Sequence, residues 1–439
     1  MLCFHEKAKS NIYWILTLRK REKRLNRLKI GLVSSFPPTK CGIANYSAKL
    51  VEALNGLLDS RSVFVFADAT DRPLEIEKSS NIVRVWRRDS SQCFLSIFGH
   101  IISKRVDIVH IQHEYLLYGG AYHGGLFPVL PLLLRLFGKK VVITMHSIMP
   151  TFFLTWPLFE KYGAGHKLVG LKRLLTIFVT RLTGIFSSKV IVHTEVARNT
   201  LIRDYGFAAE KVQVMPHGTD LQVFKFSGRD AKRQLGLDGV NVLLFFGFIH
   251  PRKGVENALR ALPKILKKYP NTKFVVAGTC HGYVSSKGRA YMNYLERLSE
   301  SLQLKPSVQF NKKFIPDNDL PLYFAAADIF ILPYTEEGII GASGALSMVA
   351  SVGKPVVASK IYRFSDVIDG ENGLLVPCGN ADALAEAVIG LLADPSLRKK
   401  IGQNLRRFAR RNCWKNVSRR TLALYLKLLN SAERTTVKS

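Results

Sequence analysis

The strongest constraint on the fold is an alternation along the chain, in which short apolar runs rich in β-branched residues are separated by longer segments with helical periodicity. A strand that is apolar throughout is buried on both faces, as in parallel sheets that helices cover on both sides. The sequence therefore predicts an α/β protein with parallel sheets. Strands are predicted at residues 28–35, 62–67, 107–112, 140–146, 189–194, 211–216, 241–248, 272–278, 328–333, 354–359 and 373–377.

The number of strands and one polar break divide the chain. Eleven strands exceed an ordinary single sheet, and the polar stretch 217–230 separates the first six from the last five. We expect two Rossmann-like domains, residues 29–216 and 217–414, after a basic N-terminal extension over residues 1–28. The helical pattern of residues 415–432 adds no strand and allows this segment to pack back on the first domain. Open parallel sheets bind ligands beyond the carboxyl ends of their strands, so the cleft between the domains is the expected site.

Charge narrows the class of partner. The chain has 64 Lys and Arg against 33 Asp and Glu, a formal net charge of +31. Such a charge favours a polyanion, which can be nucleic acid, an anionic membrane surface or a phosphorylated substrate. No basic stripe interleaved with aromatic residues and no nucleic-acid-binding motif is found, so no nucleic-acid partner is expected. The six cysteines are scattered without metal-ligand spacing, which predicts neither disulfides nor a structural metal and fits a reducing, cytoplasmic compartment.

Three apolar stretches raise the question of a membrane. The N-terminal IYWILTL is shorter than the ~20 residues of a spanning helix, and the basic block after it is in the wrong order for a signal peptide. Residues 124–140 and 168–186 are interrupted by proline or charge. Each is predicted to form amphipathic helix whose apolar side meets either the core or a membrane surface. We therefore expect an anionic membrane surface as a partner, with a peripheral position on its cytoplasmic face left open.

Polar residues follow three strands of the first predicted domain. Gly42 lies between strand 28–35 and a helical pattern, where a residue without a side chain exposes backbone amides to an anion. The alternative is a tight turn that needs glycine. The loop is not GxGxxG, so the dinucleotide fingerprint is missing. His146 ends strand 140–146, and His113 and Glu114 follow strand 107–112, so a catalytic and a structural role are both open.

The second predicted domain offers cations and a run of small residues. Arg252 and Lys253 stand in GFIHPRKG after strand 241–248, where adjacent cations suit a pyrophosphate and a solvated loop is the alternative. In EEGIIGASGALSMVASVGKP, the carboxylates Glu336 and Glu337 precede a Gly, Ala and Ser run. A polar loop that caps a helix is the simpler interpretation of that stretch alone.

The DND of residues 317–319 has the spacing of a metal-binding aspartate pair. It directly precedes the helical pattern LPLYFAAAD. We therefore expect Asp317 or Asp319 to be a helix N-cap, and we expect no metal.

Several of these motifs together resemble family 4 glycosyltransferases, in particular their mannosyltransferase-like branch. The resemblance spans about residues 29–430. It implies the GT-B fold, in which two Rossmann-like domains with parallel sheets face each other across a cleft. It further implies a nucleotide-sugar in the C-terminal domain, an acceptor in the N-terminal domain, no metal or other cofactor, and retention of anomeric configuration. The motifs, in chain order, are FPPTKCGIANYS, VVITMHS, KVQVMPHGTD, GFIHPRKGVENALRALP, AAADIFILPYTEEG, GKPVVAS and NGLLVPCGNADALAEAVIGLLADP.

The resemblance assigns roles in the first domain and at the nucleotide base. Gly42 would approach the donor phosphate, and His146 would lie beside the transferred sugar as a catalytic residue. His113 and Glu114 would be on the acceptor side. The region Lys313–Ile315, with Phe314 and Ile315, matches the part of the family that borders the base.

The resemblance also assigns the diphosphate contacts. Lys253 matches the family lysine that binds the diphosphate. Phe248 stands where the family has an arginine, and Arg252 is the candidate substitute.

Two glutamates, separated by seven residues, are typical of the family. Glu337 or Glu336 would be the first, a catalytic or donor-binding carboxylate near the sugar hydroxyls. The second is absent, because Ala345 or Ser347 stands in its place. The small residues Gly341, Ser343, Gly344 and Ala345 would bring backbone amides to the sugar diphosphate.

The predicted activity is therefore that of a retaining, metal-independent glycosyltransferase. The favoured donor is GDP-mannose, and the acceptor is a lipid-linked molecule, a glycan or a small molecule. The alternatives are a GT-B sugar-nucleotide epimerase or phosphorylase and, from another class, a nucleic-acid-binding protein. The oxocarbenium-like sugar and the departing diphosphate develop charge in the transition state, which cations and amides stabilise more than the ground state. No pair of carboxylates of the glycosidase kind is evident.

Overall fold

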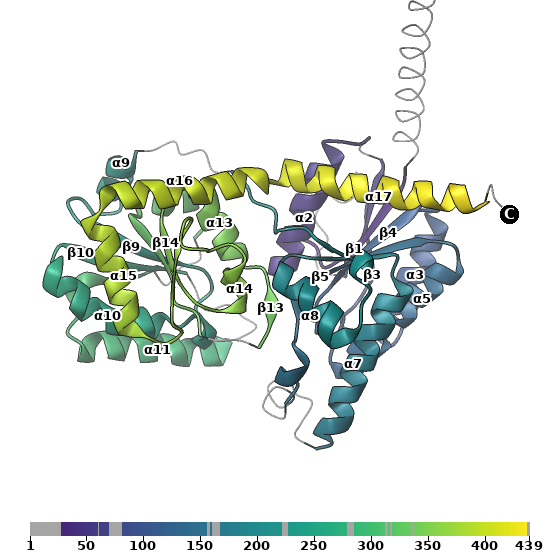
Figure 1. Cartoon of the computed structure of the whole chain (residues 1–439), viewed down its shortest axis with the longest axis horizontal. Coiled ribbons are helices and arrows are strands. Elements are labelled where there is room, and N and C mark those ends of the chain that lie inside the picture. Colours follow the sequence, from purple (N-terminus) through teal and green to yellow (C-terminus); the bar gives the residue numbers. More distant parts are fainter. Residues whose placement is uncertain are drawn as a thin grey trace, which may run out of the picture. The chain divides into compact units, whose positions relative to one another are not determined.

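The chain folds into two compact units. The structure, a computed structural model, describes residues 28–59, 61–69, 81–155, 159, 167–221, 227–278, 285–311, 315–316, 318–335 and 338–436. The described residues up to Met215, together with those from Trp414 onward, form the first unit, and Pro216–Cys413 form the second. This division lies one residue before each predicted domain boundary. The segment from Trp414 onward belongs to the first unit, so the chain returns to it after completing the second (Figure 1).

The first unit contains a seven-stranded sheet in which every pair of neighbours is parallel. The strand order is β3-β2-β1-β4-β5-β7-β8. The chain starts at β1, proceeds to one edge and then crosses to β4 on the other side of β1. The strands are β1 (Ile30–Ser34), β2 (Val63–Asp68), β3 (Ile82–Trp86), β4 (Ile108–His113), β5 (Lys140–Met145), β7 (Lys189–Val192) and β8 (Val212–Val214), and Ser147–Ile148 form the short strand β6.

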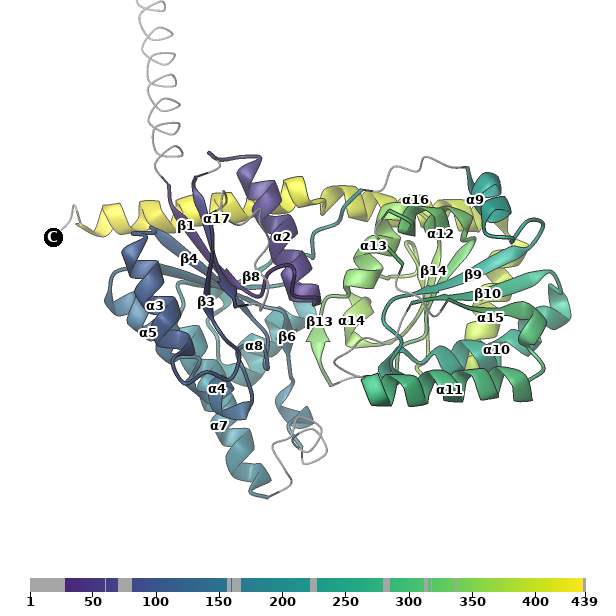
Figure 2. The same ribbon diagram turned by 180° about the vertical axis from the view of Figure 1, so that it is seen from behind.

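Helices cover both faces of this sheet. Helices α2 (Gly42–Asn55) and α17 (Trp414–Thr436) lie on one face, where Ile30, Leu50 and Tyr425 belong to one buried cluster. The views in Figures 1 and 2 place α3 and α5 on the opposite face. The remaining helical elements of this unit are α3 (Cys93–Ser103), α4 (Ala121–Leu126), α5 (Val129–Leu136), η2 (Thr151–Phe153), α7 (Val169–Phe186), α8 (Glu195–Tyr205) and η3 (Ala209–Lys211).

The second unit contains a six-stranded parallel sheet with the order β11-β10-β9-β12-β14-β15. Its topology repeats that of the first unit, since the chain starts at β9, moves to one edge and returns to β12 on the other side of β9. The strands are β9 (Asn241–Phe246), β10 (Thr272–Ala277), β11 (Val308–Asn311), β12 (Ile329–Leu332), β14 (Val356–Ser359) and β15 (Leu374–Val376), and Ile340–Gly341 form the short strand β13.

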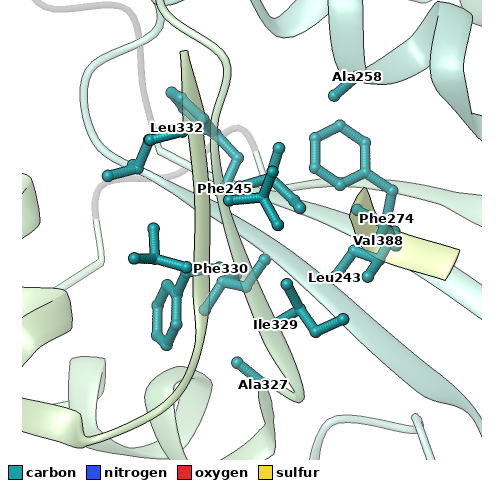
Figure 3. Packing of buried hydrophobic residues seen from close by; sticks show 14 of the residues in the cluster. Leu243, Phe245, Ala258, Phe274, Ala327, Ile329, Phe330, Leu332 and Val388 are labelled. Atoms are coloured by element: carbon teal, nitrogen blue, oxygen red, sulfur yellow. The ribbon is translucent and has the colours of Figure 1, made fainter. Parts of the chain in front are cut away.

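Most of the core of the second unit is one large cluster of apolar side chains. Leu243, Phe245 and Phe274 from β9 and β10 meet Ala258 and Val388 from the helices that pack on this face (Figure 3). These five residues are at most 6% exposed, so water is excluded from this face of the sheet. The helical elements are α9 (Gly228–Gln234), η4 (Pro251–Lys253), α10 (Val255–Lys268), α11 (Ser285–Ser301), η6 (Lys305–Ser307), α12 (Leu320–Ala326), α13 (Gly344–Val352), α14 (Tyr362–Ser365), α15 (Ala381–Ala393) and α16 (Pro395–Arg411).

The structure contains each of the eleven predicted strands, and the expected α/β fold of two Rossmann-like domains with parallel sheets is confirmed. Two longer strands, β3 and β11, were missed. Both are sheet edges whose residues are mostly only half-buried, so their sequences IVRVW and VQFN lack the continuous apolar run of a central strand. The predicted strand 241–248 ends early, because Gly247 adopts a φ of +135° that breaks the extended backbone.

Residues 124–140 and 168–186, whose apolar sides were predicted to meet either the core or a membrane surface, are both largely helical. Residues 124–140 do not form one helix, since α4 ends at Leu126 and α5 starts after Pro128. Residues 168–186 form α7. No helix within the described residues is long and apolar enough to cross a membrane.

Candidate functional site

The predicted site residues of the first unit lie at the point where its strand order reverses. Strands β1 and β4 are neighbours, and the chain leaves them in opposite directions across the sheet. Ligands of open α/β sheets bind beyond the carboxyl ends of the strands at such a point. The loop after β1 leads to Gly42, whereas His113 ends β4 and Glu114 follows it.

The loop before Gly42 is fixed by side chains from the neighbouring edge of the sheet. Asp68, the last residue of β2, accepts hydrogen bonds from the Phe36 amide (2.9 Å) and the Thr39 hydroxyl (2.7 Å). Arg84 of β3 donates to the carbonyl oxygen of Pro37 (2.6 Å) and to that of Asp68 (2.7 Å). These hydrogen bonds therefore fix the conformation of the loop.

Gly42 is the first residue of α2, and its neighbour Cys41 is the N-cap, with Sγ 3.3 Å from the Ala44 amide. A Cβ built on Gly42 would meet nothing within 4 Å, and its φ is not positive. The alternative of a tight turn that needs glycine is therefore wrong. The exposed amide end of a 14-residue helix is left open to an anion.

His146 follows β5 directly and lies among side chains from three other elements. Its Nε2 is 2.8 Å from Oε1 of Gln112 on β4, and its Nδ1 is 3.2 Å from Nε2 of His193. The ring of Tyr46 on α2 meets it edge to face, with centroids 4.8 Å apart. Since Tyr46 lies one turn after Gly42, the structure brings Gly42 and His146 into one neighbourhood.

A buried chain of hydrogen bonds continues behind His146. Nδ1 of His193 lies 2.9 Å from the Met215 carbonyl oxygen, which only accepts, so this nitrogen carries a proton. On the other side, Gln112 Nε2 is 3.3 Å from His110 Nε2, and His110 Nδ1 is 2.6 Å from the Tyr425 hydroxyl. Burial, and then the charge of His193, lower the pKa of His110 to about 3, so His110 is neutral.

This chain couples the proton on His146 to the orientation of the Gln112 amide. With Gln112 Oε1 toward His146, Nε2 of His146 donates, and the contact between the two rings requires one of them, His146 or His193, to carry two protons. With the amide turned over, Gln112 donates to Nε2 of His146, Nδ1 of His146 donates to His193, and all the rings are neutral. Oxygen and nitrogen of an amide are assigned from such networks. Gln112 and His193 therefore decide which nitrogen of His146 is basic.

His113 and Glu114 lie next to His146. The His146 amide donates to the His113 carbonyl oxygen (3.0 Å), and the Ser147 hydroxyl donates to Glu114 Oε2 (2.5 Å). Burial lowers the pKa of His113 to about 4, and its Nδ1 is buried with no hydrogen-bond partner in the described part of the chain. A neutral His113 and a hydrogen-bonded Glu114 thus form a polar surface at the end of β4 that is suited to binding hydroxyl groups.

The predicted cations of the second unit also lie where its strand order reverses. Arg252 and Lys253 form η4 in the loop after β9, and the neighbouring strand β12 leads into the loop before α13. The amide of Thr335 in the second loop donates to the Arg252 carbonyl oxygen in the first (3.1 Å). The two loops are thus joined by a backbone hydrogen bond.

Lys253 is held over an aromatic ring. Its Nζ lies 3.8 Å from the centroid of the Tyr334 ring, a cation–π contact. Tyr334 is 1% exposed, and its hydroxyl has no partner among the residues that the structure describes. Gly254, with a φ of +61°, permits this arrangement, because a Cβ there would lie 2.0 Å from the Pro333 carbonyl oxygen. The ammonium group is therefore positioned by the aromatic face below it.

Helix α13 begins in the second of these loops. Ser343 is its N-cap, with Oγ accepting from the Leu346 amide (3.2 Å). Gly344 is the first helical residue and Ala345 the second, and a Cβ on Gly344 would meet nothing within 4 Å. Arg363 donates to the Ala342 carbonyl oxygen (2.9 Å) and fixes the approach to the helix. The amides of the first turn are thus presented by a rigid turn.

Other predicted site residues are placed differently or lie outside the described residues. Phe314, Glu336 and Glu337 are outside them, so their positions are not described. Gly341 is buried in β13, and Ile315 has its side chain in the core cluster of the second unit, at 7% exposed. Phe248, which stands where the family has an arginine, is 44% exposed.

The DND stretch of residues 317–319 differs from the prediction in one respect. Asp319 is at the N-cap position of α12, but its side chain makes no capping hydrogen bond, because its backbone is already in the right-handed helical region. Asp317 lies outside the described residues. Within the described ranges, no group of three or more His, Cys, Asp or Glu is arranged to hold a metal. Metal independence stays a prediction.

Four residues of the site were not predicted from the sequence: Gln112, His193, Tyr46 and Tyr334. His193 ends the predicted strand 189–194, so the rule that selected His146 would also have selected it. Tyr46 was interpreted only as part of an amphipathic pattern, and Tyr334 lies inside a motif without a distinguishing spacing. Gln112 has no signal, since its role depends on strand β4 lying beside β5.

The two sets of residues have complementary chemistry. The second unit offers a fixed ammonium group and a helix N-terminus, which bind a diphosphate and stabilise the charge it gains on leaving. The first unit offers a second helix N-terminus, a histidine held by contacts with Gln112 and His193, and polar groups at the end of β4, which can bind and orient hydroxyl groups.

Two family models match the chain. Residues 41–223 match the family model described as Glycosyltransferase Family 4, and residues 228–408 match the one described as Glycosyl transferases group 1. The two matches follow one another and together take in most of the chain.

Two curated relatives illustrate the range of similarity. The GDP-mannose-dependent alpha-(1-6)-phosphatidylinositol monomannoside mannosyltransferase of Mycolicibacterium smegmatis is 25% identical over 385 residues, 84% of this chain and 91% of that protein. The D-inositol 3-phosphate glycosyltransferase 2 of Catenulispora acidiphila is 29% identical over 243 residues, 54% of this chain and 56% of that protein. The chain spans about half the length of the inositol phosphate enzymes it matches.

Solved structures with the same fold extend over nearly the whole chain. Sucrose-phosphate synthase of Thermosynechococcus elongatus has a TM-score of 0.71 at 21% identity, covering 92% of this chain and 100% of that one. HepE of Anabaena in complex with UDP has a TM-score of 0.69 at 18% identity, covering 91% and 100%. At these identities the likeness establishes the fold alone.

Proposed function

The chain belongs to the family 4 glycosyltransferases and has the GT-B fold, and from this we propose that it transfers a sugar from a nucleotide-sugar donor to an acceptor with retention of anomeric configuration and without a metal. The second unit binds the donor diphosphate, and the first unit binds the acceptor. Lys253, with Arg252 beside it, and the first turn of α13 at Gly344 and Ala345 contact the diphosphate.

One observation carries this proposal. Lys253 stands over the buried ring of Tyr334, in loops joined by a backbone hydrogen bond, at the point where the second sheet reverses its strand order. A cation in solvent would have many orientations, whereas this one is fixed before the substrate arrives. Such preorganised charge is what stabilises a leaving group in the transition state.

The remaining groups act on the sugar and the acceptor. As the glycosyl–phosphate bond breaks, negative charge grows on the diphosphate and positive character grows on the sugar ring. Lys253 and the amides of α13 stabilise the negative charge on the diphosphate. His146, with its basic nitrogen set by Gln112 and His193, orients the transferred sugar, while His113 and Glu114 lie on the acceptor side. Glu337 or Glu336 supplies the carboxylate near the sugar hydroxyls.

GDP-mannose is the donor we propose, with a lipid-linked molecule, a glycan or a small molecule as the acceptor. Support for mannose comes from the 25% identity to the GDP-mannose-dependent mannosyltransferase, which extends over 91% of that protein. The name of that relative specifies a phosphatidylinositol-linked acceptor. The net charge of +31 supports an anionic membrane surface as a further partner.

The test is a donor panel of GDP-, UDP-, ADP- and dTDP-sugars with the full chain. We expect one nucleotide class to raise the melting temperature by mass action, and nucleotide release to depend on an acceptor and to persist in EDTA. The anomeric configuration of the product, read by NMR, should match that of the donor. Epimerised nucleotide-sugar without an acceptor, or turnover that depends on inorganic phosphate, would replace transfer by epimerase or phosphorylase activity.

A further inference from the structure

Helix α7 presents large apolar side chains to the surrounding solvent. Its N-cap and five of its residues are each 51–70% exposed. The helix has 18 residues, of which only Thr180, Thr183 and Gly184 are buried. These six exposed residues are Leu168, Leu171, Leu174, Leu175, Phe178 and Ile185, and we call them the α7 stripe.

The α7 stripe occupies one side of the helix. At about 100° per residue, its members fall within an arc of about 120°. Lys172 and Arg181 fall just beyond the two borders of the arc, while the buried Thr180 and Thr183 fall on the opposite side. The helix is therefore amphipathic, with its apolar side facing away from the protein.

Helix α7 packs on the rest of the unit through its inner side, and the stripe takes no part in this packing. Gly184 lies so close to Phe207 that a Cβ there would be 2.4 Å from the ring. The hydroxyls of Thr176, Thr180 and Thr183 donate to carbonyl oxygens four residues earlier, at 2.8 to 2.9 Å. Small and internally satisfied residues thus face the protein, and folding of the described residues uses none of the stripe as core.

Two basic side chains from other elements contact the C-terminal end of α7, and one of them precedes two further exposed apolar residues. Arg135 of α5 and Lys211 both donate to the Ile185 carbonyl oxygen, at 2.7 and 3.1 Å. Two residues that directly follow Arg135, Leu136 and Phe137, are 71% and 58% exposed. Cations at a helix C-terminus are electrostatically favourable, and here they stand beside apolar surface.

Basic residues outnumber acidic ones in this part of the chain. From residue 115 to residue 194 there are nine Lys and Arg and a single acidic residue, Glu160. An apolar stripe bordered by lysine and arginine suits the boundary between lipid headgroups and acyl chains, where long basic side chains reach the phosphates. A second copy of the chain would bring the same positive charge against itself.

We propose that the α7 stripe, with Leu136 and Phe137, rests on an anionic lipid bilayer and that Lys172 and Arg181 contact its headgroups. This deepens the proposed function, because it names the surface by which the first unit meets the membrane that we expect as a partner. The stripe enters the headgroup region without spanning the bilayer, since α7 contains three cations, Lys172, Arg173 and Arg181.

The test uses the full chain, vesicles of phosphatidylcholine alone and vesicles with added phosphatidylglycerol, in a co-sedimentation assay. We expect binding to the anionic vesicles to be stronger and to weaken with salt. The double variant L174S/F178S should lower the partition coefficient at least about tenfold. The matched control Y294S/L397S removes two exposed apolar residues of the second unit and should bind like the wild type.

A second experiment, in which membrane contact produces a signal, distinguishes weaker binding from a folding defect. In F178W, brominated phosphatidylglycerol vesicles should quench the added tryptophan, whereas in L397W they should not. Equal sedimentation of L174S/F178S and wild type, unquenched F178W, or a homodimer that only the stripe variant loses would overturn the proposal. Vesicle binding requires no turnover, and donor-induced thermal shifts of the same variants should be unchanged, so failure here is distinct from failure of the transferase assignment.

Discussion

Replacing Lys253 by methionine should remove the charge that we place on the departing diphosphate while keeping the side-chain length. Methionine can cover the same face of Tyr334, since thioethers pack well on aromatic rings. The surrounding backbone is held by the hydrogen bond from Thr335 to Arg252 and by the positive φ of Gly254. We therefore expect K253M to fold like the wild type.

The size of the effect follows from two contributions of Lys253. Two unit charges about 4 Å apart attract by about 4 kcal/mol at an effective dielectric constant of about 20. The contact with the Tyr334 ring contributes only about 0.5–1 kcal/mol to folding at a partly exposed position. The loss therefore falls mainly on the transition state, and kcat should drop about 10²- to 10³-fold while the melting temperature shifts little.

The assay is steady-state nucleotide release with the donor that the panel identifies, at saturating acceptor. K253R should recover part of the rate, because it restores the charge with a different geometry. K267M removes an exposed cation from α10 and should behave like the wild type. Turnover by K253M within about threefold of wild type would refute the assignment of Lys253 to the leaving group.

Three further predictions concern the supports of the site. G254A should lower the free energy of unfolding by about 2 kcal/mol or more, in urea melts, because of the φ of +61° and the approach to the Pro333 carbonyl oxygen. Q112L should lower kcat about tenfold to a hundredfold without changing donor-induced thermal shifts, because His146 loses its partner on β4; an unchanged pH–rate profile would contradict this role. Stability should fall below about pH 6.5, by up to about 1.4 kcal/mol per pH unit, and less so in H110Q, because His110 has its pKa lowered to about 3 and takes up a proton only on unfolding.

Controls for these variants are available within the chain. G344A adds a Cβ where nothing lies within 4 Å and should leave the free energy of unfolding unchanged, in contrast to G254A. For the pH effect, the sign follows from the unfolded histidine having the higher pKa, so the unfolded state binds more protons as pH falls. A free energy of unfolding that increased as the pH was lowered from 7 to 5 would contradict a neutral, buried His110.

The candidate site was predictable where a residue's position along a strand decides its place. His146 and Gly42 follow strands of the first sheet, and Lys253 follows a strand of the second. Each lies beyond the carboxyl end of a strand of its own sheet, so sequence alone could place them. Gln112 could not be found, because its contact with His146 depends on the pairing of β4 with β5. Tyr334 escaped for a similar reason, since its ring meets Lys253 only after β9 and β12 become neighbours.

The edge strand β3 shows how local composition can mislead. Arg84 interrupts its apolar run, which is why the strand was missed. In the fold, that arginine holds the loop before Gly42 by donating to the carbonyl oxygens of Pro37 and Asp68. A charged residue that weakens a strand signal is here a support of the candidate site.

The sequence by itself determined the two parallel sheets and their central strands, because continuous apolar runs separated by amphipathic helices have few other ways to exclude water. It could not decide which side of an amphipathic helix faces inward. The pattern of residues 168–186 was compatible with the core and with a membrane surface. Only the tertiary structure decided this, since the close approach of Gly184 to Phe207 turns the small residues of α7 toward the protein and its leucines away.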